Sequence, residues 1–353
     1  MGPMSASRPS LANSARGFAR RLAFAGALAL TATAPPQASA DPIELKLSYF
    51  GSEHEATYLS GIKPFVDAVN GEGKGLVDIR VYFNGTLGRS QAQQPQLVLD
   101  GGADMAFLVI GLTPYRFPDS ALIELPGMFE SAREGTLVYT RLIAEQKLHG
   151  YDDFLVIGAY TAEPDVIHSR KPTKSLDDLK GQKIRANNPT EADALAALGA
   201  TPTVLEMPKI AQAIAAGAVD GTSLSPTGMV EFGVARVAAY HYLLRIGAAP
   251  FALVMNRKRL AGLPQQVQTL IAKYSGDWTA AHWASTYEIA ERQFLSQLRA
   301  DPEQHVMTPS PADLKTAQRA YQDVSEAWAA NSPRNRELLR VLRKQLAAVR
   351  SGD

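Results

Sequence analysis

The 353-residue sequence contains no cysteine. This absence excludes disulfides, thiolate metal sites, iron–sulfur clusters and cysteine nucleophiles. An excess of charge is also lacking, because 36 basic and 35 acidic residues leave a net charge of +1, which argues against a nucleic-acid-binding protein with a broad basic face. No G-x-G-x-x-G, P-loop, G-x-S-x-G or H-E-x-x-H motif occurs. The composition, 46% hydrophobic and 20% charged, is that of a globular protein with a core, and the length suggests about two domains.

Long apolar runs are scarce, and the clearest one lies near the N-terminus. Residues 22–34 follow the basic residues Arg16, Arg20 and Arg21 and precede the small residues Ala38-Ser39-Ala40. The run is shorter than the roughly 18 apolar residues that span a bilayer, which favours a signal peptide cleaved after Ala40 over a membrane anchor. Removing residues 1–40 leaves 32 basic and 35 acidic residues. We therefore expect an exported, soluble periplasmic protein with a net charge of −3.

The mature chain opens with a β-α-β-α-β pattern. Alternating and buried apolar runs predict strands over 43–50, 77–83 and 103–110, and helical spacing predicts helices over 58–69 and 91–99. This order is typical of a mostly parallel sheet covered by helices. Such sheets bind ligands beyond the carboxyl ends of their strands. We therefore expect ligand contacts in the loops after Phe50, Phe83 and Ile110.

A second α/β pattern follows, with strands over 154–160, 183–186 and 203–205 and helices over 190–198 and 208–216. A strand over 251–255 is expected to return to the first unit. Helices are expected over 264–298, with a weak break at Ser275-Gly276, and over 311–330 and 334–349. The predicted domain I therefore comprises 41–162 and 251–275, and domain II comprises 163–250 and 276–353. The tract 264–298 would cross both domains, and hinges would lie near Ala162 and Pro250.

Candidate metal or cofactor sites are few. Glu53-His54-Glu55 is the nearest approach to a metal cluster, but adjacent side chains point in different directions. A solvated loop and a ligand-contacting loop therefore both stay open as explanations. The tryptophans Trp278 and Trp283 are expected to pack within the long helical tract. We expect no cofactor and no metal, since no pair of histidines has metal-ligand spacing: His54, His149, His168, His241, His282 and His305.

Residues 174–226 carry three motifs in a fixed order. They are DLKGQKIR at 178–185, LGATP at 198–202 and GAVDG at 217–221. Further matches are GTLG at 85–88, GGADM at 101–105 and LPGMF at 125–129, followed by Asn256 and Leu263-Pro264. Together they resemble the solute-binding proteins of TRAP (tripartite ATP-independent periplasmic) transporters, the DctP-type family. The resemblance covers roughly 43–310.

The resemblance implies an α/β, two-domain periplasmic solute-binding protein fold, a type II-like clamp with a long helix bridging both domains. It implies a receptor, not an enzyme, that captures a small organic acid and delivers it to the membrane subunits of a TRAP transporter. An ABC-type solute receptor, a sensor-input protein and an exported α/β enzyme are the alternatives. A homodimer through the C-terminal helices stays open, because such helices mediate dimers in some relatives.

The resemblance also implies ligand contacts in the second domain. Its most consistent contact is the arginine of the KIR motif, here Arg185. The chemistry fits independently, since a guanidinium meets a carboxylate with two parallel hydrogen bonds. Asn187 is expected to be a neighbouring donor. The hydroxyl groups after the VDG motif are further candidates, although each could bond the local backbone instead: Thr222, Ser223 and Ser225.

Many members carry a second arginine some 20 residues before the KIR motif, and this sequence has Gly158 to Pro164 there instead. Tyr160 is expected to take that place, with Glu163 and His168 nearby. The loss of the second cation favours a monocarboxylate with an apolar or aromatic body over a dicarboxylate. From the first domain, the candidate contacts lie on loops after strands: Glu53, His54 and Ser90.

Overall fold

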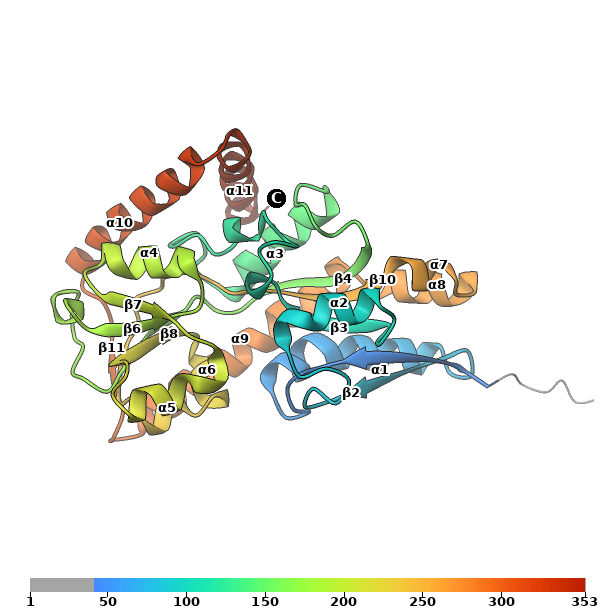
Figure 1. Cartoon of the computed structure of the whole chain (residues 1–353), viewed down its shortest axis with the longest axis horizontal. Helices are drawn as coiled ribbons and strands as arrows, with labels where there is room; N and C mark the ends of the chain where they lie inside the picture. The colour runs from blue at the N-terminus through green and yellow to red at the C-terminus, as the bar shows by residue number, and fades with distance from the viewer. Residues whose placement is uncertain (1–40, 353) are drawn as a thin grey trace, which may run out of the picture. The chain divides into compact units, whose positions relative to one another are not determined.

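Two β-sheets with helices on their faces make up the fold (Figure 1). The computed structural model describes residues 41–352. The expected signal peptide and its cleavage after Ala40 lie outside the described residues. No helix of residues 41–352 combines the length and the apolarity needed to cross a membrane.

The first sheet has the order β2-β1-β3-β10-β4. Strand β1 runs parallel to both β2 and β3, while β10 is antiparallel to β3 and to β4. The strand expected over 251–255 therefore does return to the first sheet. The bounds are β1 Ile43–Ser48, β2 Val77–Tyr82, β3 Met105–Val109, β4 Phe154–Thr161 and β10 Pro250–Asn256.

The second sheet has the order β11-β9-β5-β8-β6-β7. Strand β6 pairs in parallel with β7 and β8, and β5 pairs antiparallel with β8 and β9. The bounds are β5 Val166–Ser169, β6 Lys183–Ala186, β7 Thr201–Val204, β8 Gly221–Leu224, β9 Tyr240–Tyr242 and β11 His305–Met307.

The helices follow the predicted order with several additions. A π-helical turn, η1 (Tyr58–Ile62), leads into α1. The longer helices are α1 Lys63–Glu72, α2 Gln94–Leu99, α3 Ala132–Ala144, α4 Pro189–Ala197, α5 Ile210–Ala215, α6 Pro226–Glu231, α7 Arg257–Ala261, α8 Gln265–Lys273, α9 Asp277–Ala300, α10 Pro311–Ala330 and α11 Pro333–Ser351. Short 3₁₀ turns are η2 Gln91–Gln93, η3 Ile110–Leu112, η4 Ser120–Leu122, η5 Asp177–Leu179, η6 Met207–Lys209 and η7 Val234–Arg236.

Some elements were not predicted from the sequence. Helices α3, α6 and α7 and strands β5, β9 and β11 were not predicted, because most of these segments are too short to show a period. The tract 264–298 is interrupted at the position that the sequence indicated. It is divided into α8 and α9 at Gly276, whose φ of 64° and ψ of −123° lie outside the helical region and favour glycine.

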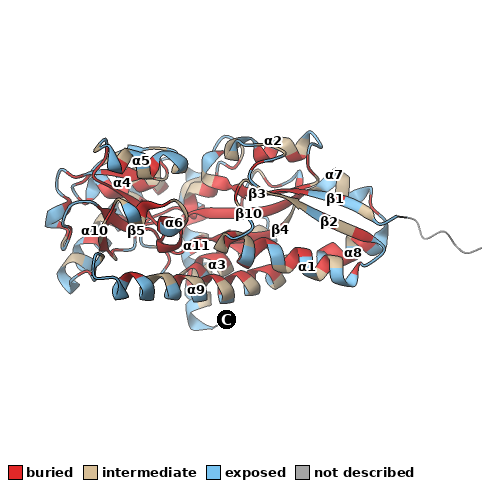
Figure 2. Cartoon of the chain, turned by 90° about the horizontal axis from the view of Figure 1, so that it is seen from below, coloured by how far each residue is buried: buried red, intermediate tan, exposed pale blue. Residues whose placement is uncertain are grey.

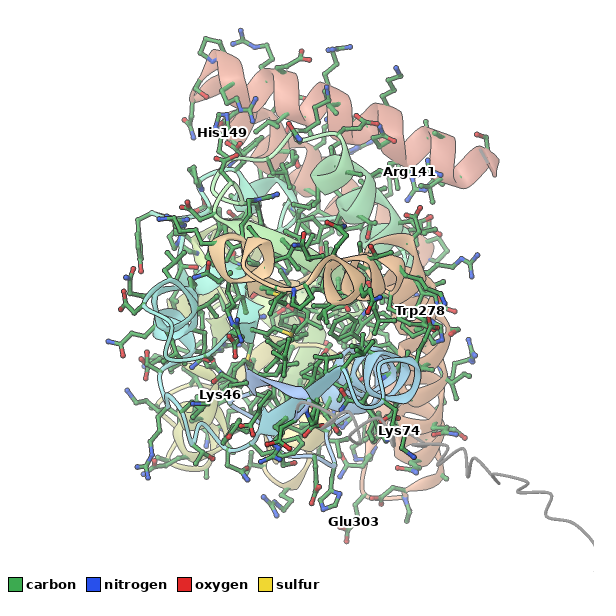
Figure 3. All side chains as sticks on the ribbon, turned by 90° about the vertical axis from the view of Figure 1, so that its right-hand side faces the viewer. Lys46, Lys74, Arg141, His149, Trp278 and Glu303 are labelled. Atoms are coloured by element: carbon green, nitrogen blue, oxygen red, sulfur yellow. The ribbon has the colours of Figure 1, made fainter. Side chains whose placement is uncertain are left out.

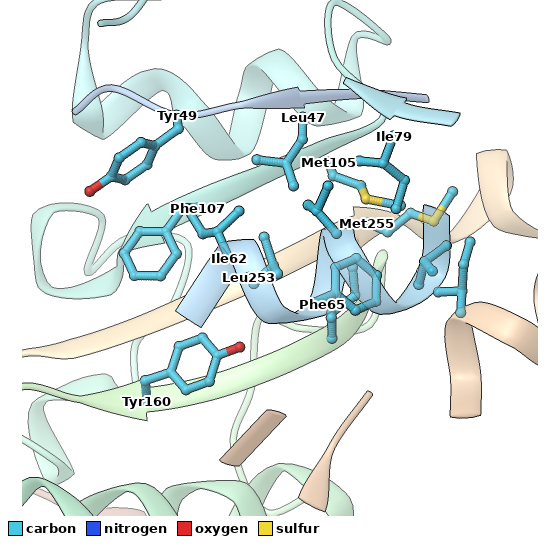
Figure 4. Close-up of a cluster of buried hydrophobic side chains, with 14 of the residues drawn as sticks. Leu47, Tyr49, Ile62, Phe65, Ile79, Met105, Phe107, Tyr160, Leu253 and Met255 are labelled. Carbon is cyan, nitrogen blue, oxygen red and sulfur yellow. The ribbon is translucent and has the colours of Figure 1, made fainter. Parts of the chain in front are cut away.

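The core of the first sheet follows the two-residue period of its buried strands. In β3, Met105 and Phe107 face one hydrophobic cluster, and Ala106 and Leu108 face the other. Strand β10 divides in the same way. Figure 4 shows Met105, Phe107 and Leu253 converging on side chains of α1 and β1. A central strand buried on both faces reads as a continuous apolar run, which is why 103–110 was identifiable from the sequence.

Helix α9 runs along both sheets (Figure 2). It contacts β4 and α3 at the first sheet and α6 and β11 at the second. Trp283 of α9 is fully buried, and its ring stacks on Tyr160 of β4 at 4.7 Å between centroids. Its indole nitrogen donates a hydrogen bond to the Thr161 carbonyl at 2.8 Å. The expected bridging helix and the packing role of Trp283 are both present.

The chain passes between the sheets at several places. It leaves the first sheet after β4, which ends at Thr161, and returns at β10, which begins at Pro250.

Helix α11 packs on α3 and on the hydrophobic cluster of the first sheet that contains Ala106 and Leu108. Charged side chains such as Lys74, His149 and Glu303 lie at the periphery (Figure 3). The residue boundaries of the two domains stay a prediction.

Candidate functional site

A cleft lies between the strand ends of the first sheet and the second sheet. Its outer part has a volume of about 1450 Å³ and its inner part about 530 Å³, and both values include space open to solvent. We call these the outer cleft and the inner cleft. They are continuous, because both are lined by Gln91, Val109, Asn187, Met207 and Ala249.

The first-sheet side of the cleft is formed by the three loops that the sequence indicated. Tyr49 and Phe50 follow β1, the segment from Arg89 to Ala92 follows β2, and Val109 to Leu112 ends β3. The inner cleft is rich in aromatic rings, which come mainly from this side: Tyr49, Phe50, Phe107, Phe251, Phe232 directly after α6 and Tyr287 of α9.

Arg185 lies on the second-sheet side, in β6, and lines the outer cleft. It is only 2% exposed. Its Nε donates to the Leu205 carbonyl at 2.9 Å, and its Nη1 donates to Asn187 Oδ1 and, at 3.4 Å, to the Ser223 carbonyl. Within residues 41–352, Nη2 makes no hydrogen bond and the guanidinium makes no ion pair. Burial lowers the pKa of Arg185, and the carboxylates of Glu191 and Asp165 act in the opposite direction.

A polar network holds Arg185 in place. The Asn187 side chain accepts from Arg185 and donates to Asp165 Oδ2 at 2.6 Å. Glu191, buried in α4, accepts from the Asn187 backbone N–H and from the Ser223 hydroxyl, each at 2.5 Å. Asn188 caps α4, because its side chain accepts from the Glu191 N–H. Arg185 is therefore held in a fixed position, and its Nη2 has no hydrogen-bond partner among residues 41–352.

Four of the sequence-predicted residues line the cleft. Arg185 and Ser90 line the outer cleft, Ser225 lines the inner cleft and Asn187 lines both. Ser225 caps α6, since its hydroxyl accepts from the Gly228 N–H at 3.2 Å. Its side chain therefore has a structural role at this position in addition to any contact with a ligand.

The other predicted residues lie outside the lining of both parts. Tyr160 points into the first core, where its hydroxyl donates to the Gly61 carbonyl at 3.2 Å. Thr222 and Ser223 are buried in β8, where the Thr222 hydroxyl donates to the Ser223 carbonyl and the Ser223 hydroxyl donates to Glu191 of α4. Glu163 is buried beyond the end of β4, and burial raises its pKa to about 7. The geometry does not bring these four residues to the cleft.

His168 also lies outside the cleft, within the second sheet. Its Nδ1 lies 2.8 Å from His241 Nδ1, and its Nε2 lies 3.0 Å from the Leu224 carbonyl. Burial lowers the pKa of His168 well below its usual range. Glu53 and His54 are exposed and lie next to each other at 3.9 Å. The neighbouring Glu55 is the residue of this loop that lines the inner cleft.

Several cleft residues were not predicted, above all the carboxyl groups Glu55, Glu124, Asp165 and Glu231 and the exposed cation Arg89. Glu55 accepts hydrogen bonds from the Tyr49 hydroxyl at 2.6 Å and from the Ser52 N–H at 2.9 Å. The loop sequence shows which residues are polar, but this hydrogen-bonded turn decides that Glu55 turns inward. The sequence does not show that the Tyr49 hydroxyl bonds to Glu55, so the inward direction of Glu55 was not predictable.

One hydrogen bond joins the two sides of the cleft. The Ala56 N–H, before η1, donates to Glu231 Oε1 of α6 at 2.8 Å. Burial, assisted by the charge of Glu55, raises the pKa of Glu231 to about 7. Burial and Glu191 raise the pKa of Asp165 well above its usual range. The inner cleft therefore combines aromatic rings with two carboxyl groups whose pKa values are raised, Asp165 and Glu231.

Metal-ligating side chains do not gather in groups of three or more anywhere in the described part of the chain. The His168–His241 pair is buried inside the second sheet and bonded on both sides. What the cleft offers chemically is a guanidinium, amide and hydroxyl donors, carboxyl groups and aromatic surface. These are the groups of a binding site for a polar molecule with an apolar body.

The family profile described as bacterial extracellular solute-binding protein, family 7 (DctP), matches residues 48–331. The chain belongs to this family. The resemblance to DctP-type receptors of TRAP transporters that the motifs carry is therefore confirmed, and with it a solute receptor. The family and its structural relatives are solute-binding proteins and not enzymes.

Individual relatives are more distant. The C4-dicarboxylate-binding periplasmic protein DctP of Rhodobacter capsulatus is 26% identical over 270 residues, which are 73% of this chain and 78% of that protein. A marine metagenome TRAP solute-binding protein specific for aromatic acids has a TM-score of 0.77 at 23% identity, covering 87% of this chain and 99% of that one. A TRAP solute-binding protein of Rhodoferax ferrireducens has a TM-score of 0.76 at 24% identity, covering 86% and 98%. These structures confirm the two-domain clamp fold.

Proposed function

We propose that this DctP-family chain is a periplasmic receptor that binds an organic acid through its carboxylate at Arg185. The observation that carries the proposal is the state of that side chain, which is buried, held by neutral acceptors and left with Nη2 unbonded at the cleft wall. An unpaired charge is costly to bury. A ligand carboxylate supplies the missing partner and accepts the hydrogen bond that Nη2 can donate.

We propose further that the ligand is a monocarboxylate with an apolar or aromatic body. The rings of Tyr49, Phe50 and Phe251 form a surface on which such a body could pack, and Met207 adds an adaptable apolar side chain. Two of the structural relatives support this class by their own ligands, 3-hydroxybenzoate in one and benzoate in the other.

A dicarboxylate is the second candidate, and one observation favours it. Arg89 is not among the ligand contacts predicted from the sequence. It lines the outer cleft from the loop after β2, as Arg185 lines it from β6. It could hold a second carboxylate, as a C4-dicarboxylate receptor of this family would require. Arg89 is exposed, however, so solvent and salt screen its charge more than that of Arg185.

The acid would be carried to the membrane subunits of a TRAP transporter after export and signal cleavage after Ala40. Binding would close the two domains around the acid, with hinges near Ala162 and Pro250, where the chain crosses between the sheets. The ligand can favour the closed form only by contacting both sides. The cleft provides this, since Arg185 and Asn187 belong to one side and Phe50 and Ser90 to the other.

The test is a thermal-shift panel of benzoate, 3-hydroxybenzoate, phenylacetate, succinate and neutral sugars. We expect aromatic monocarboxylates to stabilise the wild type, by about 2.7 kcal/mol at 100 times the dissociation constant. Arg185→Ala should abolish the shift, whereas Arg299→Ala, an exposed arginine of α9, should keep it. Stabilisation by succinate alone would favour the dicarboxylate. Stabilisation by sugars alone would overturn the proposal.

A further inference from the structure

Glu124 is a buried carboxyl group at the cleft that has no partner. It lies between η4 and the LPGMF segment, is 6% exposed and lines the outer cleft. Neither carboxyl oxygen makes a hydrogen bond or an ion pair with any residue of 41–352. The other carboxyl groups of this region all accept hydrogen bonds: the buried Asp165 and Glu191 and the half-buried Glu231.

The chain makes room for this carboxyl group. It lies directly over Gly111, where an added Cβ would fall 2.0 Å from Glu124 Oε1. Gly111 itself lines the outer cleft, as Arg185 does. The carboxyl group thus occupies the space of a missing side chain at the cleft wall, where a ligand in the outer cleft can reach it.

Charged and titratable groups surround Glu124 on the protein side. Glu191 of α4 is the carboxylate that acts on it, and the buried phenols of Tyr139 in α3 and Tyr151 before β4 experience its charge. None of these groups is a cation. Two cations, Arg185 and the exposed Arg89, line the same outer cleft, and neither forms an ion pair with Glu124.

We propose that Glu124 is a second anchor for the ligand: as a neutral acid, it donates a hydrogen bond from its O–H to an oxygen of the acid whose carboxylate Arg185 holds. This inference rests on the proposed function. No covalent change is involved, and the proton stays on Glu124. An ionised Glu124 would instead repel the ligand, so only the protonated form of the receptor would bind tightly.

The protonation equilibrium supports this role. Burial, with a further contribution from Glu191, raises the pKa of Glu124 to about 8, so the acid form prevails at pH 7. Binding to the protonated form is complete below this pKa and weakens as the pH rises through it. Between pH 7 and pH 9 the dissociation constant should therefore rise about 10-fold, and binding at pH 9 should take up nearly one proton per ligand.

The experiment is calorimetric titration with benzoate, or with the acid of the panel that stabilises the wild type most, at pH 7 and pH 9. Each titration is repeated in buffers of different ionisation enthalpy, which measures proton uptake. Glu124→Gln keeps a donor without a titrating proton. We expect it to bind within about 3-fold of wild type at pH 7 and to lose both the pH dependence and the proton uptake. Glu124→Leu, which keeps the bulk but no donor, should bind about 10-fold more weakly at pH 7.

The matched control is Glu291→Gln, a buried carboxyl group of α9 with a pKa raised to about 7 that lines neither part of the cleft. It should follow the wild type. The inference is overturned if Glu124→Gln keeps the wild-type pH dependence, or if Glu124→Leu binds like wild type while Arg185→Ala does not bind. In that case the proposed function stands. If no acid binds the wild type, the proposed function fails and this inference fails with it.

Discussion

The two sides of the cleft are built from different chemistry. The second-sheet side is a hydrogen-bonded network in which Arg185, Asn187, Asp165 and Glu191 fix one another. The first-sheet side presents aromatic rings on loops after strand ends, among them Phe50 and Tyr49. Network geometry is rigid and suits a charged group of fixed shape, whereas aromatic surface accepts apolar bodies of many shapes.

The difference suggests a division of labour in the proposed receptor. One side would recognise the group that all its ligands share, the carboxylate. The other would select among acids by the size and shape of the rest of the molecule. Changes on the second-sheet side should therefore reduce binding of every acid, and changes on the first-sheet side should reduce binding of some acids more than others.

The largest effect is expected for Arg185→Ala. Removing one partner of a buried charge pair costs roughly 2–5 kcal/mol, so binding should weaken about 30- to 3,000-fold for all acids alike. Arg185→Lys should also bind poorly, because an ammonium group cannot reproduce the planar fork. Calorimetry on folded variants measures this. Near-normal affinity in Arg185→Ala would show that the second-sheet side does not hold the ligand carboxylate.

A smaller and more selective effect is expected for Phe50→Ala. Losing one buried aromatic contact costs about 1.5–3 kcal/mol, which would weaken binding of benzoate about 10- to 140-fold and leave a ligand as small as acetate nearly unaffected. Phe83→Ala is the matched control, since Phe83 packs on the same cluster but lines neither part of the cleft. An equal loss for acetate and benzoate would contradict the division of labour.

The carboxyl groups of the cleft predict how stability depends on pH. Burial raises the pKa of Glu231 to about 7 and of Glu124 to about 8, above the unfolded value. A raised carboxyl pKa stabilises the fold at low pH, and this contribution is lost as the pH rises through the folded pKa. The empty protein should therefore melt at a lower temperature at pH 8.5 than at pH 6.5.

The variant Glu231→Gln tests this prediction. It should flatten the decline in stability between pH 6.5 and pH 8.5 by roughly 1 kcal/mol, as followed by thermal denaturation. The buried histidines act in the opposite direction, because burial lowers the pKa values of His168 and His241 and the unfolded chain binds more protons at pH 6.5 than the folded protein does. Both histidines are present in the wild type and in the variant, so their contribution cancels when the two proteins are compared. A decline with pH that is equal in Glu231→Gln and in the wild type would contradict the raised pKa of Glu231.

The smallest signal is expected from closure. If the ligand contacts both sides, saturating benzoate should reduce the radius of gyration measured by small-angle scattering. The hydrogen bond from the Ala56 N–H to Glu231 already joins the two sides, so the change should be modest. An unchanged radius, with binding established separately, would favour a preformed pocket over a clamp.

Much of the cleft's position was predictable from local sequence. The strands that end at Ser48, Tyr82 and Val109 have clear apolar patterns, and sheets bind ligands beyond such ends. Arg185 stood out because a charged residue ended a short apolar strand within a family motif. These features are set by residues that are close together in the chain, so they can be recognised from the sequence alone.

The direction in which individual side chains point was not predictable from the sequence. Glu55 and His54 are adjacent and both polar, yet the bond from the Tyr49 hydroxyl turns Glu55 inward while His54 stays exposed. Tyr160 was expected at the ligand, but Trp283, more than a hundred residues away in the chain, holds it in the core. Glu124 precedes a motif and has no periodic signal. Such placements depend on tertiary contacts between distant segments.

The central claim is that the cleft holds an organic acid through Arg185. The most direct measurement is mass spectrometry of small molecules released by denaturing the purified wild type and Arg185→Ala, after both have been incubated with the acid panel and desalted. The account predicts that the wild type releases a carboxylic acid in near-stoichiometric amount and that Arg185→Ala releases none. Release of the same acid in equal amount from both proteins, or of only a molecule without a carboxylate, would contradict it.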